Sequence, residues 1–424
     1  MFLILTLLLC FYVAWNIGAN DVGNNMGTPV SAGSLSFKNA VLIAVIFEFL
    51  GAVLVGGYVV KTISTDILNL SLYEGDPRIL IIAMFCSLLA SGFWITIATV
   101  FKMPVSTTHS IIGAVVGAGL VTVGAGAICW AKIKLIAISW LVSPFLGGLI
   151  SYIIFNIYKY LIFNKDDPFI QLKRIAPFFV FIVIFTLAMA TIYKGLKNLH
   201  LNLDLVPALL ISVAAGAAGA VFTAIRMKNK KASGDQVNDV EDFSKPLHVI
   251  AASYECFAHG ANDVANAVGP VFGIIMLTKY LKYKAGSDIP GSMIQFMTCS
   301  GGGIPPYILL IGAAGIVLGI TTFGKNVMET IGKRITEITP SRGFASGFAT
   351  ATTVLLGSRL GCPLSSTHIV VGTVAGVGIG RGIGTLNAKV LLSIFMSWFL
   401  TLPVSAGLCV LLYLLLKDII IRLI

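Results

Sequence analysis

Charge is scarce in this sequence. Only 11% of its 424 residues are Asp, Glu, Lys or Arg, and just 18 residues are acidic. A soluble domain carries about 25% charged residues, because it must cover its surface with groups that bind water. Since 57% of the residues are hydrophobic, the composition excludes an ordinary soluble protein.

Cysteines in metal or disulfide patterns are also missing. The seven cysteines include no pair at zinc-site spacing and no secreted disulfide pattern, and four of them stand inside apolar runs: Cys10, Cys86, Cys129 and Cys409. We interpret them as small buried residues. The formal net charge of +11 would fit a nucleic-acid partner, but Lys and Arg also collect in the cytoplasmic loops of membrane proteins. We therefore expect no nucleic-acid partner.

Apolar runs about as long as a membrane-spanning helix recur along the chain. They are Val41 to Val60, Ile79 to Phe101, Ile133 to Ile157, Ala176 to Ile192, Val206 to Ile225, Tyr307 to Phe323 and Val390 to Leu416. An earlier run, Met1 to Trp15, lacks the basic leader and cleavage site of a signal peptide, so we expect a retained helix. The sequence predicts an all-α polytopic protein of the plasma membrane, with about 10 to 12 transmembrane helices in the lipid bilayer.

Two polar motifs occur twice, in the same order. GANDVGNN, which begins at Gly18, returns as GANDVANA at Gly260, and PVSTTH, which begins at Pro104, returns as PLSSTH at Pro363. Two motifs in the same order indicate an internal duplication. We predict three parts: an N-terminal repeat, a central helix pair with polar cytoplasmic loops, and a C-terminal repeat, at 1–157, 158–245 and 246–424.

The two repeats are expected to have opposite orientations in the membrane. Seven apolar runs begin between the start of one repeat and the start of the next, and an odd number of crossings inverts the second copy. The basic loop 158–174 and the polar loop 226–245, which we expect to be flexible, are separated by two runs and share the cytoplasmic side. Inverted repeats with broken or re-entrant helices are typical of transporters whose site lies at the repeat interface.

The GAND motif places a carboxylate and two amides beside apolar helix. A carboxylate there is costly, so it must face a cavity, a partner or an ion. We expect the glycines to break the helix so that freed carbonyls also point inward. Oxygen-only ligands suit a hard cation such as sodium, the only metal ion expected. The candidate sodium ligands are Asn20, Asp21, Asn24, Asn262, Asp263 and Asn266. The alternative is a polar seam that joins helices.

The PVSTTH motif has the pattern of a helix N-terminus. Pro104 breaks the preceding run, hydroxyl residues follow, and an apolar helix begins at about Ile111. Free backbone N–H groups and the positive end of the helix dipole suit an anion. The candidate hydroxyl ligands from both repeats are Ser106, Thr107, Thr108, Ser365, Ser366 and Thr367. Ordinary helix capping is the alternative.

Further polar residues stand in or near apolar runs. We expect His109 and His368 to be hydrogen-bond partners behind the site rather than ligands. Glu48 has no acidic counterpart in the second repeat, where we align it with the stretch 309–312. It is either an ion-coupling or proton-carrying group, or one member of a buried pair. Glu255 aligns with Val13, and we interpret it as part of a polar helix face.

Taken together, GANDVANAVGP, PVSTTH and the string TPSRGF at Thr339 to Phe344 resemble the inorganic phosphate transporter (PiT) family over nearly the whole chain. The resemblance implies a symporter that imports inorganic phosphate with sodium or, in some members, with protons, and that needs no cofactor besides the coupling ion. It also implies that Asp21 and Asp263 bind the cation and help to hold phosphate, and that Glu48 matches an important acid. The chain departs from the family at Gly347, near a position that is often acidic.

Two other classes of protein fit less well. A membrane phosphatase would need an arginine in its phosphate site, but PSRG occurs once and the paired motifs contain no arginine. A channel for neutral solutes would not place aspartates in both halves of an apolar chain. We therefore expect a transporter rather than an enzyme, and an apolar face on the segment 176–225 could serve a homodimer.

Overall fold

The computed structural model describes residues 1–101, 103, 105–193, 203–285, 292–299, 304–331, 338–382 and 388–424. In this part of the chain the regular structure is helical, apart from two isolated β-bridges. Nine of the described helices are long and apolar enough to cross a membrane. The predicted class, an all-α polytopic membrane protein, is confirmed.

The first half and the central segment contain seven α-helices. They are α1 (Phe2–Ser31), α2 (Phe37–Val55), α3 (Pro77–Val100), α4 (Thr107–Thr122), α5 (Trp130–Tyr158), α6 (Pro168–Ile192) and α7 (Leu205–Lys228). Short π- and 3-10 segments interrupt the connections: η1 (Thr62–Asp66), η2 (Leu70–Tyr73), η3 (Ala125–Ala127) and η4 (Lys159–Phe163).

The second half is built on one very long helix. It comprises α8 (Gln236–Ala285), α9 (Met293–Cys299), α10 (Pro306–Ile331), α11 (Pro340–Arg359), α12 (Ser366–Arg381) and α13 (Ala388–Ile420). Besides the seven-residue α9, three of the described helices are too short or too polar to be classed as spans, namely α4, α11 and α12. Counting them brings the total into the expected range of about 10 to 12.

The GAND motifs lie inside continuous helices, so the prediction that their glycines break the helix is wrong. Helix α1 continues through Gly18, and α8 continues through Gly260. A Cβ atom at Gly18 would lie 2.0 Å from the carbonyl oxygen of Ile316, and one at Gly260 would lie 2.2 Å from that of Glu48. These glycines are therefore needed where helix backbones touch, as in other close helix packings in membranes.

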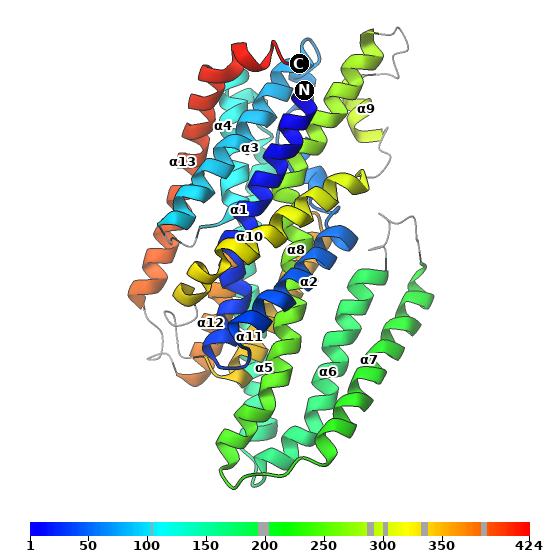
Figure 1. The fold of residues 1–424 in the computed structure, drawn as a ribbon, viewed down its shortest axis with the longest axis vertical. Helices are drawn as coiled ribbons and strands as arrows, with labels where there is room; N and C mark the ends of the chain where they lie inside the picture. Colours follow the sequence, from blue (N-terminus) through cyan, green and yellow to red (C-terminus); the bar gives the residue numbers. More distant parts are fainter. Residues whose placement is uncertain are drawn as a thin grey trace.

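The close contacts between the two halves are reciprocal. Gly51 of α2 packs against the backbone of Phe257 in α8, and the equivalent Gly319 of α10 packs against Trp15 in α1. The hairpin helices repeat the relation, since Gly113 of α4 faces α13 and Gly372 of α12 faces α5. Helices α1 and α8 also run in opposite directions (Figure 1). This is the exchange of partners that an inverted duplication would produce.

Each half contains a helical hairpin whose tip lies in the middle of the molecule. The tips connect α3 to α4 and α11 to α12 (Figure 1). Helix α4 begins at Thr107, a few residues before the expected start, and α12 begins at Ser366. The predicted caps are present, because Ser106 and Ser365 accept hydrogen bonds from the backbone N–H groups three residues further along, at His109 and His368. Pro104 lies outside the described residues.

The central segment forms the hairpin of α6 and α7. The expected flexible loop over 226–245 is mostly helical, since α7 extends to Lys228 and α8 starts at Gln236. Asp235 caps α8 by accepting a hydrogen bond from the N–H of Asn238 at 3.2 Å, which starts the helix earlier than its charge pattern indicated. Helix α8 thus crosses the proposed boundary at residue 245. The division into three parts stays a prediction, as does a homodimer.

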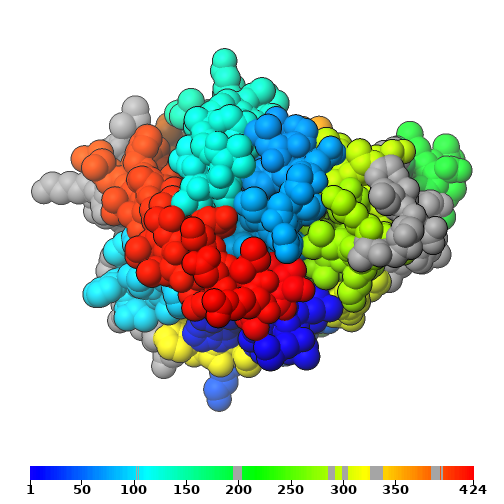
Figure 2. Space-filling model, turned by 90° about the horizontal axis from the view of Figure 1, so that it is seen from above, coloured from blue at the N-terminus to red at the C-terminus, as the bar shows by residue number. Residues whose placement is uncertain are grey.

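Both ends of the chain lie on one face. The N- and C-terminal labels are adjacent in Figure 1, and the view onto this face shows the end of α13 in red next to the first residues of α1 in dark blue (Figure 2). Tyr413 of α13 belongs to the same buried cluster as Leu9 and Val13 of α1. The C-terminal helix therefore closes the hydrophobic core of the N-terminal half.

The backbone contact at Gly18 gives a prediction for stability. Gly18→Ala places a methyl group 2.0 Å from the oxygen of Ile316, so α1 and α10 must separate. Overpacking of this kind costs about 1–3 kcal/mol. We expect a lower midpoint of thermal unfolding for the purified protein in detergent. The matched control is Gly75→Ala, because a Cβ there has no neighbour within 4 Å. Equal midpoints for the two variants would contradict the close packing.

Candidate functional site

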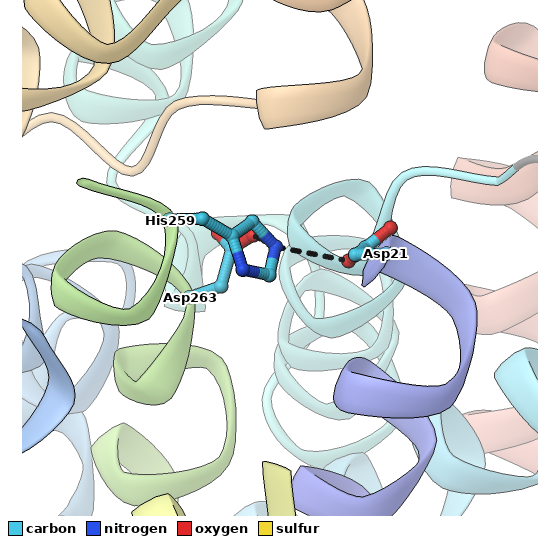
Figure 3. A group of neighbouring side chains, drawn as sticks. All are labelled: Asp21, His259 and Asp263. Carbon is cyan, nitrogen blue, oxygen red and sulfur yellow. Dashed lines mark ion pairs between the residues drawn. The ribbon is translucent and has the colours of Figure 1, made fainter. Parts of the chain in front are cut away.

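One buried aspartate from each half lies at the centre of the molecule. Asp21 of α1 and Asp263 of α8 are both fully buried. One carboxylate oxygen of each, together with a ring nitrogen of His259, lie within 4.8 Å of one another (Figure 3). They meet because α1 and α8 pack together at their GAND motifs. The structure thus brings the two predicted acidic ligands into one site.

His259 is a site residue that the sequence reasoning missed. Its Nε2 atom lies 2.6 Å from a carboxylate oxygen of Asp263 and 3.7 Å from one of Asp21. The string HGAND contained the signal for this contact. His259 and Asp263 are four residues apart in it, and residues four apart share one face of a helix. In the first repeat the equivalent residue is Ile17, so this imidazole has no counterpart.

Glu48 is the partner of His259. Its Oε2 atom lies 3.1 Å from Nδ1 of His259, and its Oε1 atom accepts a hydrogen bond from Asn25 at 2.9 Å. The reciprocal glycine contacts make Ile316 the counterpart of Glu48, which corrects our alignment with 309–312. Glu48 and His259, one from each half, therefore occupy positions whose counterparts in the opposite halves are the apolar residues Ile316 and Ile17.

The hairpin tips place hydroxyl groups against the aspartates. Thr107 donates a hydrogen bond to Oδ2 of Asp21 at 2.9 Å, and Ser366 donates to Oδ2 of Asp263 at 3.0 Å. Each hydroxyl therefore serves the aspartate of its own repeat. The near-equal distances show that the two halves build the same local arrangement.

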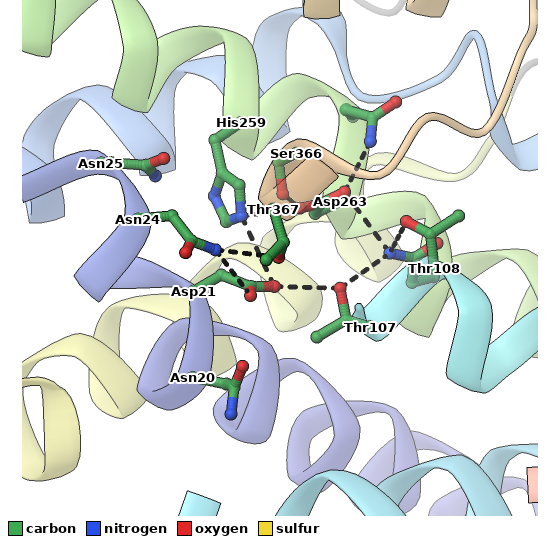
Figure 4. Close-up of polar contacts among 12 residues, drawn as sticks. Asn20, Asp21, Asn24, Asn25, Thr107, Thr108, His259, Asp263, Ser366 and Thr367 are labelled. Atoms are coloured by element: carbon green, nitrogen blue, oxygen red, sulfur yellow. Dashed lines mark hydrogen bonds and ion pairs between the residues drawn. The ribbon is translucent and has the colours of Figure 1, made fainter. Parts of the chain in front are cut away.

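The second asparagine of each motif reaches into the opposite half (Figure 4). Asn24 donates to the hydroxyl of Thr367 at 3.0 Å, and Asn266 donates to that of Thr108 at 3.1 Å. The hydroxyl of Thr108 in turn donates to the carbonyl of Leu364 at 2.9 Å. The amides thus tie both hairpin tips to both motif helices.

The first asparagine of each motif points to a different neighbour. Asn20 donates to Thr99 of α3 at 3.0 Å, and Asn262 accepts from Ser358 of α11 at 2.9 Å. Asn262 also donates to Asp263 at 2.5 Å, whereas Asn20 lies apart from the carboxylates (Figure 4). The structure therefore places Asn262 beside the aspartates and turns Asn20 towards α3.

Two kinds of polar group in the site are left without protein partners. The first two backbone N–H groups of α4 and of α12 donate to no acceptor among the described residues. They belong to Thr107, Thr108, Ser366 and Thr367. The side-chain oxygens of Asn25 and Asn266 are buried and accept no hydrogen bond from this part of the chain. The N–H groups can receive an anion and the amide oxygens a cation. Asn25 was not predicted.

His109 and His368 lie on the outer side of the tips. Their ring centroids are 4.4 Å apart, and the rings pack against Trp140 and Trp398 at 3.8 and 3.5 Å. They belong to an aromatic cluster between α4, α5, α12 and α13. The expected role of the two histidines as hydrogen-bond partners behind the site stays a prediction. The paired tryptophans, which recur at equivalent places in the sequence, were the signal for this packing.

A buried carboxylate stands beside Gly347. A Cβ atom at that glycine would lie 3.0 Å from Oε2 of Glu255, and only 3% of Glu255 is exposed. The interpretation of Glu255 as part of a polar helix face stays a prediction, and Glu255 lies four residues before His259 on α8. Members of the resembled family often have an acidic residue on α11 near the position of Gly347. In this chain the acidic residue near that position is Glu255, which belongs to α8.

Comparisons with known proteins agree with this arrangement. The profile of the phosphate transporter family matches residues 17–409. A Haemophilus influenzae protein described as a phosphate permease is 39% identical over 98% of this chain and 96% of its own. The chloroplastic inorganic phosphate transporter 2-1 of Arabidopsis thaliana is 37% identical, over 96% of this chain and 70% of its own.

The fold has a solved relative as well. A structure described as the sodium-dependent phosphate transporter superposes with a TM-score of 0.88 at 39% identity, and the match covers 99% of both chains. Neither an enzyme nor a channel for neutral solutes accounts for these matches. The chain belongs to the phosphate transporter family, a family of multi-pass membrane transporters.

Proposed function

We propose that the protein imports inorganic phosphate across the plasma membrane in symport with sodium. The observation that carries the proposal is the position of Asp21 and Asp263, whose carboxylates approach within 4.8 Å between two helix N-termini. One arrangement offers acidic oxygens and uncommitted N–H groups together. A site for a cation and an anion at once is what a phosphate symporter needs.

The cation part of the proposal rests on charge. Two carboxylates 4.8 Å apart repel each other by about 3 kcal/mol at an effective dielectric constant of about 20. His259 lies between them and offsets part of this repulsion when it is protonated. Sodium bound by the aspartates and by the free amide oxygens of Asn25 and Asn266 would offset the rest, since hard cations prefer oxygen ligands.

The anion part rests on the two hairpin tips. Helices α4 and α12 begin at Thr107 and Ser366, and the positive ends of their dipoles meet near the aspartates. Phosphate between the tips would accept hydrogen bonds from the backbone N–H groups, from the hydroxyl of Thr367 and, once that hydroxyl turns from the carbonyl of Leu364, from Thr108. Its negative charge would be unfavourable next to Asp21 and Asp263 unless sodium were bound first. This order of binding couples the two solutes.

Transport requires the loaded site to open on the other side. The reciprocal contacts give two halves that can exchange conformations, because each motif helix packs against a helix of the opposite repeat. A movement of the hairpin tips relative to α1 and α8 would change the side from which the site is reached, as in other transporters with repeated halves. The asparagine bridges from Asn24 and Asn266 would then reform in the other state.

Proton coupling is the second candidate, and the pair of Glu48 and His259 favours it. The pair is buried, lies next to Asp21 and Asp263, and takes one residue from each half, with no polar counterpart at the equivalent residues Ile316 and Ile17. The match to a structure described as a sodium-dependent transporter supports sodium. Under the sodium proposal, the pair keeps His259 in place between the aspartates.

The coupling ion is tested by radiolabelled phosphate uptake into proteoliposomes at fixed membrane potential. We expect a sodium gradient to drive uptake and a proton gradient alone to fail. Asp21→Asn and Asp263→Asn should each weaken the apparent sodium affinity about tenfold or more, which corresponds to at least about 1.4 kcal/mol. The exposed Asp418→Asn serves as the control. Normal sodium dependence in both site variants would refute the proposed cation site.

The anion site is tested at the hairpin tips. Thr108→Ala and Thr367→Ala each remove one hydroxyl, and a neutral hydrogen bond contributes about 1 kcal/mol. We expect the KM for phosphate to rise about fivefold while the sodium dependence stays normal. Thr278→Ala is the control, because that hydroxyl bonds only within its own helix. If phosphate and sodium affinities fell together, the two sites would not be separable.

The buried pair is tested by a double-mutant cycle. We measure uptake rates for Glu48→Gln, His259→Gln and the double variant. Each single change leaves the other group without its charged partner, so the double variant should be no slower than the slower single one. The expected coupling energy is about 1 kcal/mol or more. Additive losses, with unchanged elution of the three proteins on size-exclusion columns, would contradict a functional pair.

A further inference from the structure

The hairpin of α6 and α7 leaves a wedge-shaped groove beside α8. Helix α7 packs on α6, and the first turns of α8 also pack on α6, but α7 and α8 make little direct contact. Between them lies a cavity of about 510 Å³. Its floor includes Val180 and Ile184 of α6, and its walls include Phe222 of α7 and Leu247 of α8. Figure 1 shows the hairpin of α6 and α7 beside the first turns of α8.

One end of the groove is basic. Arg226 lies in the last turn of α7 and Lys230 follows it, and both line the cavity. Their cationic groups lie over the rings of Phe222 and Phe243, 5.6 and 5.4 Å from the centroids. The ion pairs found in the described part of the chain include neither residue. Two cations therefore face the groove without a carboxylate partner.

Two acidic side chains near the basic end of the groove already have other partners. Asp242 also lines the groove, but it is paired with Lys245 at 2.6 Å. The backbone N–H and the hydroxyl of Ser233 both donate hydrogen bonds to the carboxylate of Asp239, each at 2.8 Å. The positive charge at the end of the groove is therefore not cancelled by the neighbouring turns of α8.

The basic end lies at the level of a membrane surface. Helix α7 is an apolar span of 24 residues, and Arg226 stands at its basic end, where lysines and arginines meet phospholipid headgroups. Phe222, one turn inward, is 63% exposed. The groove therefore runs from the headgroup region towards the hydrocarbon of the bilayer.

We propose that this groove binds one anionic phospholipid of the bilayer. The headgroup phosphate lies between Arg226 and Lys230, and an acyl chain lies along Val180, Ile184 and Leu247. An anionic phospholipid matches the groove in charge and in shape, because two cationic side chains at one end are followed directly by an apolar lining. A zwitterionic lipid fits less well because its own cation would lie beside two basic side chains.

The bound lipid would join the central hairpin to the transport site. It fills the space between α7 and α8, and α8 continues without a break from Leu247 to Asp263. Sixteen residues of helix span about 24 Å. A lipid at this position would hold α6 and α7 against the helix that carries His259 and Asp263.

The test measures lipid binding to the purified full-length protein by native mass spectrometry, during titration with phosphatidylglycerol or phosphatidylcholine. We expect saturable binding of one phosphatidylglycerol per chain. Arg226→Gln/Lys230→Gln should weaken it by about fivefold for each cation removed. Lys228→Gln/Lys231→Gln is the matched control, because it removes the same charge from exposed neighbours that do not line the groove. Ile250→Trp should also weaken binding by filling the groove.

Three results would overturn the proposal. They are equal binding of the two lipids, equal losses in the two double variants, and displacement of the lipid by millimolar inorganic phosphate without any effect of Ile250→Trp. The last result would identify a surface site for the free anion. Because the measurement is of lipid binding, it does not depend on the coupling ion or on phosphate uptake.

Discussion

The structure depends on holding two carboxylates close together inside an apolar protein. Asp21 and Asp263 are fully buried within 4.8 Å of each other, and each is costly unless its charge is offset. The groups that surround them lower the free-energy cost of burying the two charges. They are an imidazole between the carboxylates, one hydroxyl donor for each, and two helix N-termini. Under the proposed function, a bound cation would offset the rest of this cost.

The fold supplies this proximity through close helix packing. Glycines at the crossings let α1 approach α10 and α8 approach α2 at backbone distance, so the motif helices remain straight and continuous. The chain is broken at the hairpin tips instead, where capped helices begin at Thr107 and Ser366. Rigid helices therefore carry the carboxylates, and the tips carry the groups that would grip phosphate and move.

The two halves are alike in their hydrogen bonds and different in their charges. Thr107 with Asp21 and Ser366 with Asp263 repeat the same bond at 2.9 and 3.0 Å. Glu48 and His259, by contrast, stand where the other half has Ile316 and Ile17. In the proposed transport cycle the repeated bonds would support binding in either conformation, whereas the pair of Glu48 and His259, which has no polar counterpart, would make the two conformations unequal.

The sequence by itself determined the class of the protein, the repeated motifs and the two aspartates that the structure brings together. Apolar run length predicts spanning helices, and a motif used twice predicts a composite site, because both depend on local composition and order. The tertiary structure decided that Gly18 and Gly260 pack helices rather than break them, and it brought Glu48 to His259 and Asn25 to Glu48. A glycine permits either outcome, and a lone buried charge does not name its partner. Both are settled only when helices distant in the chain come into contact.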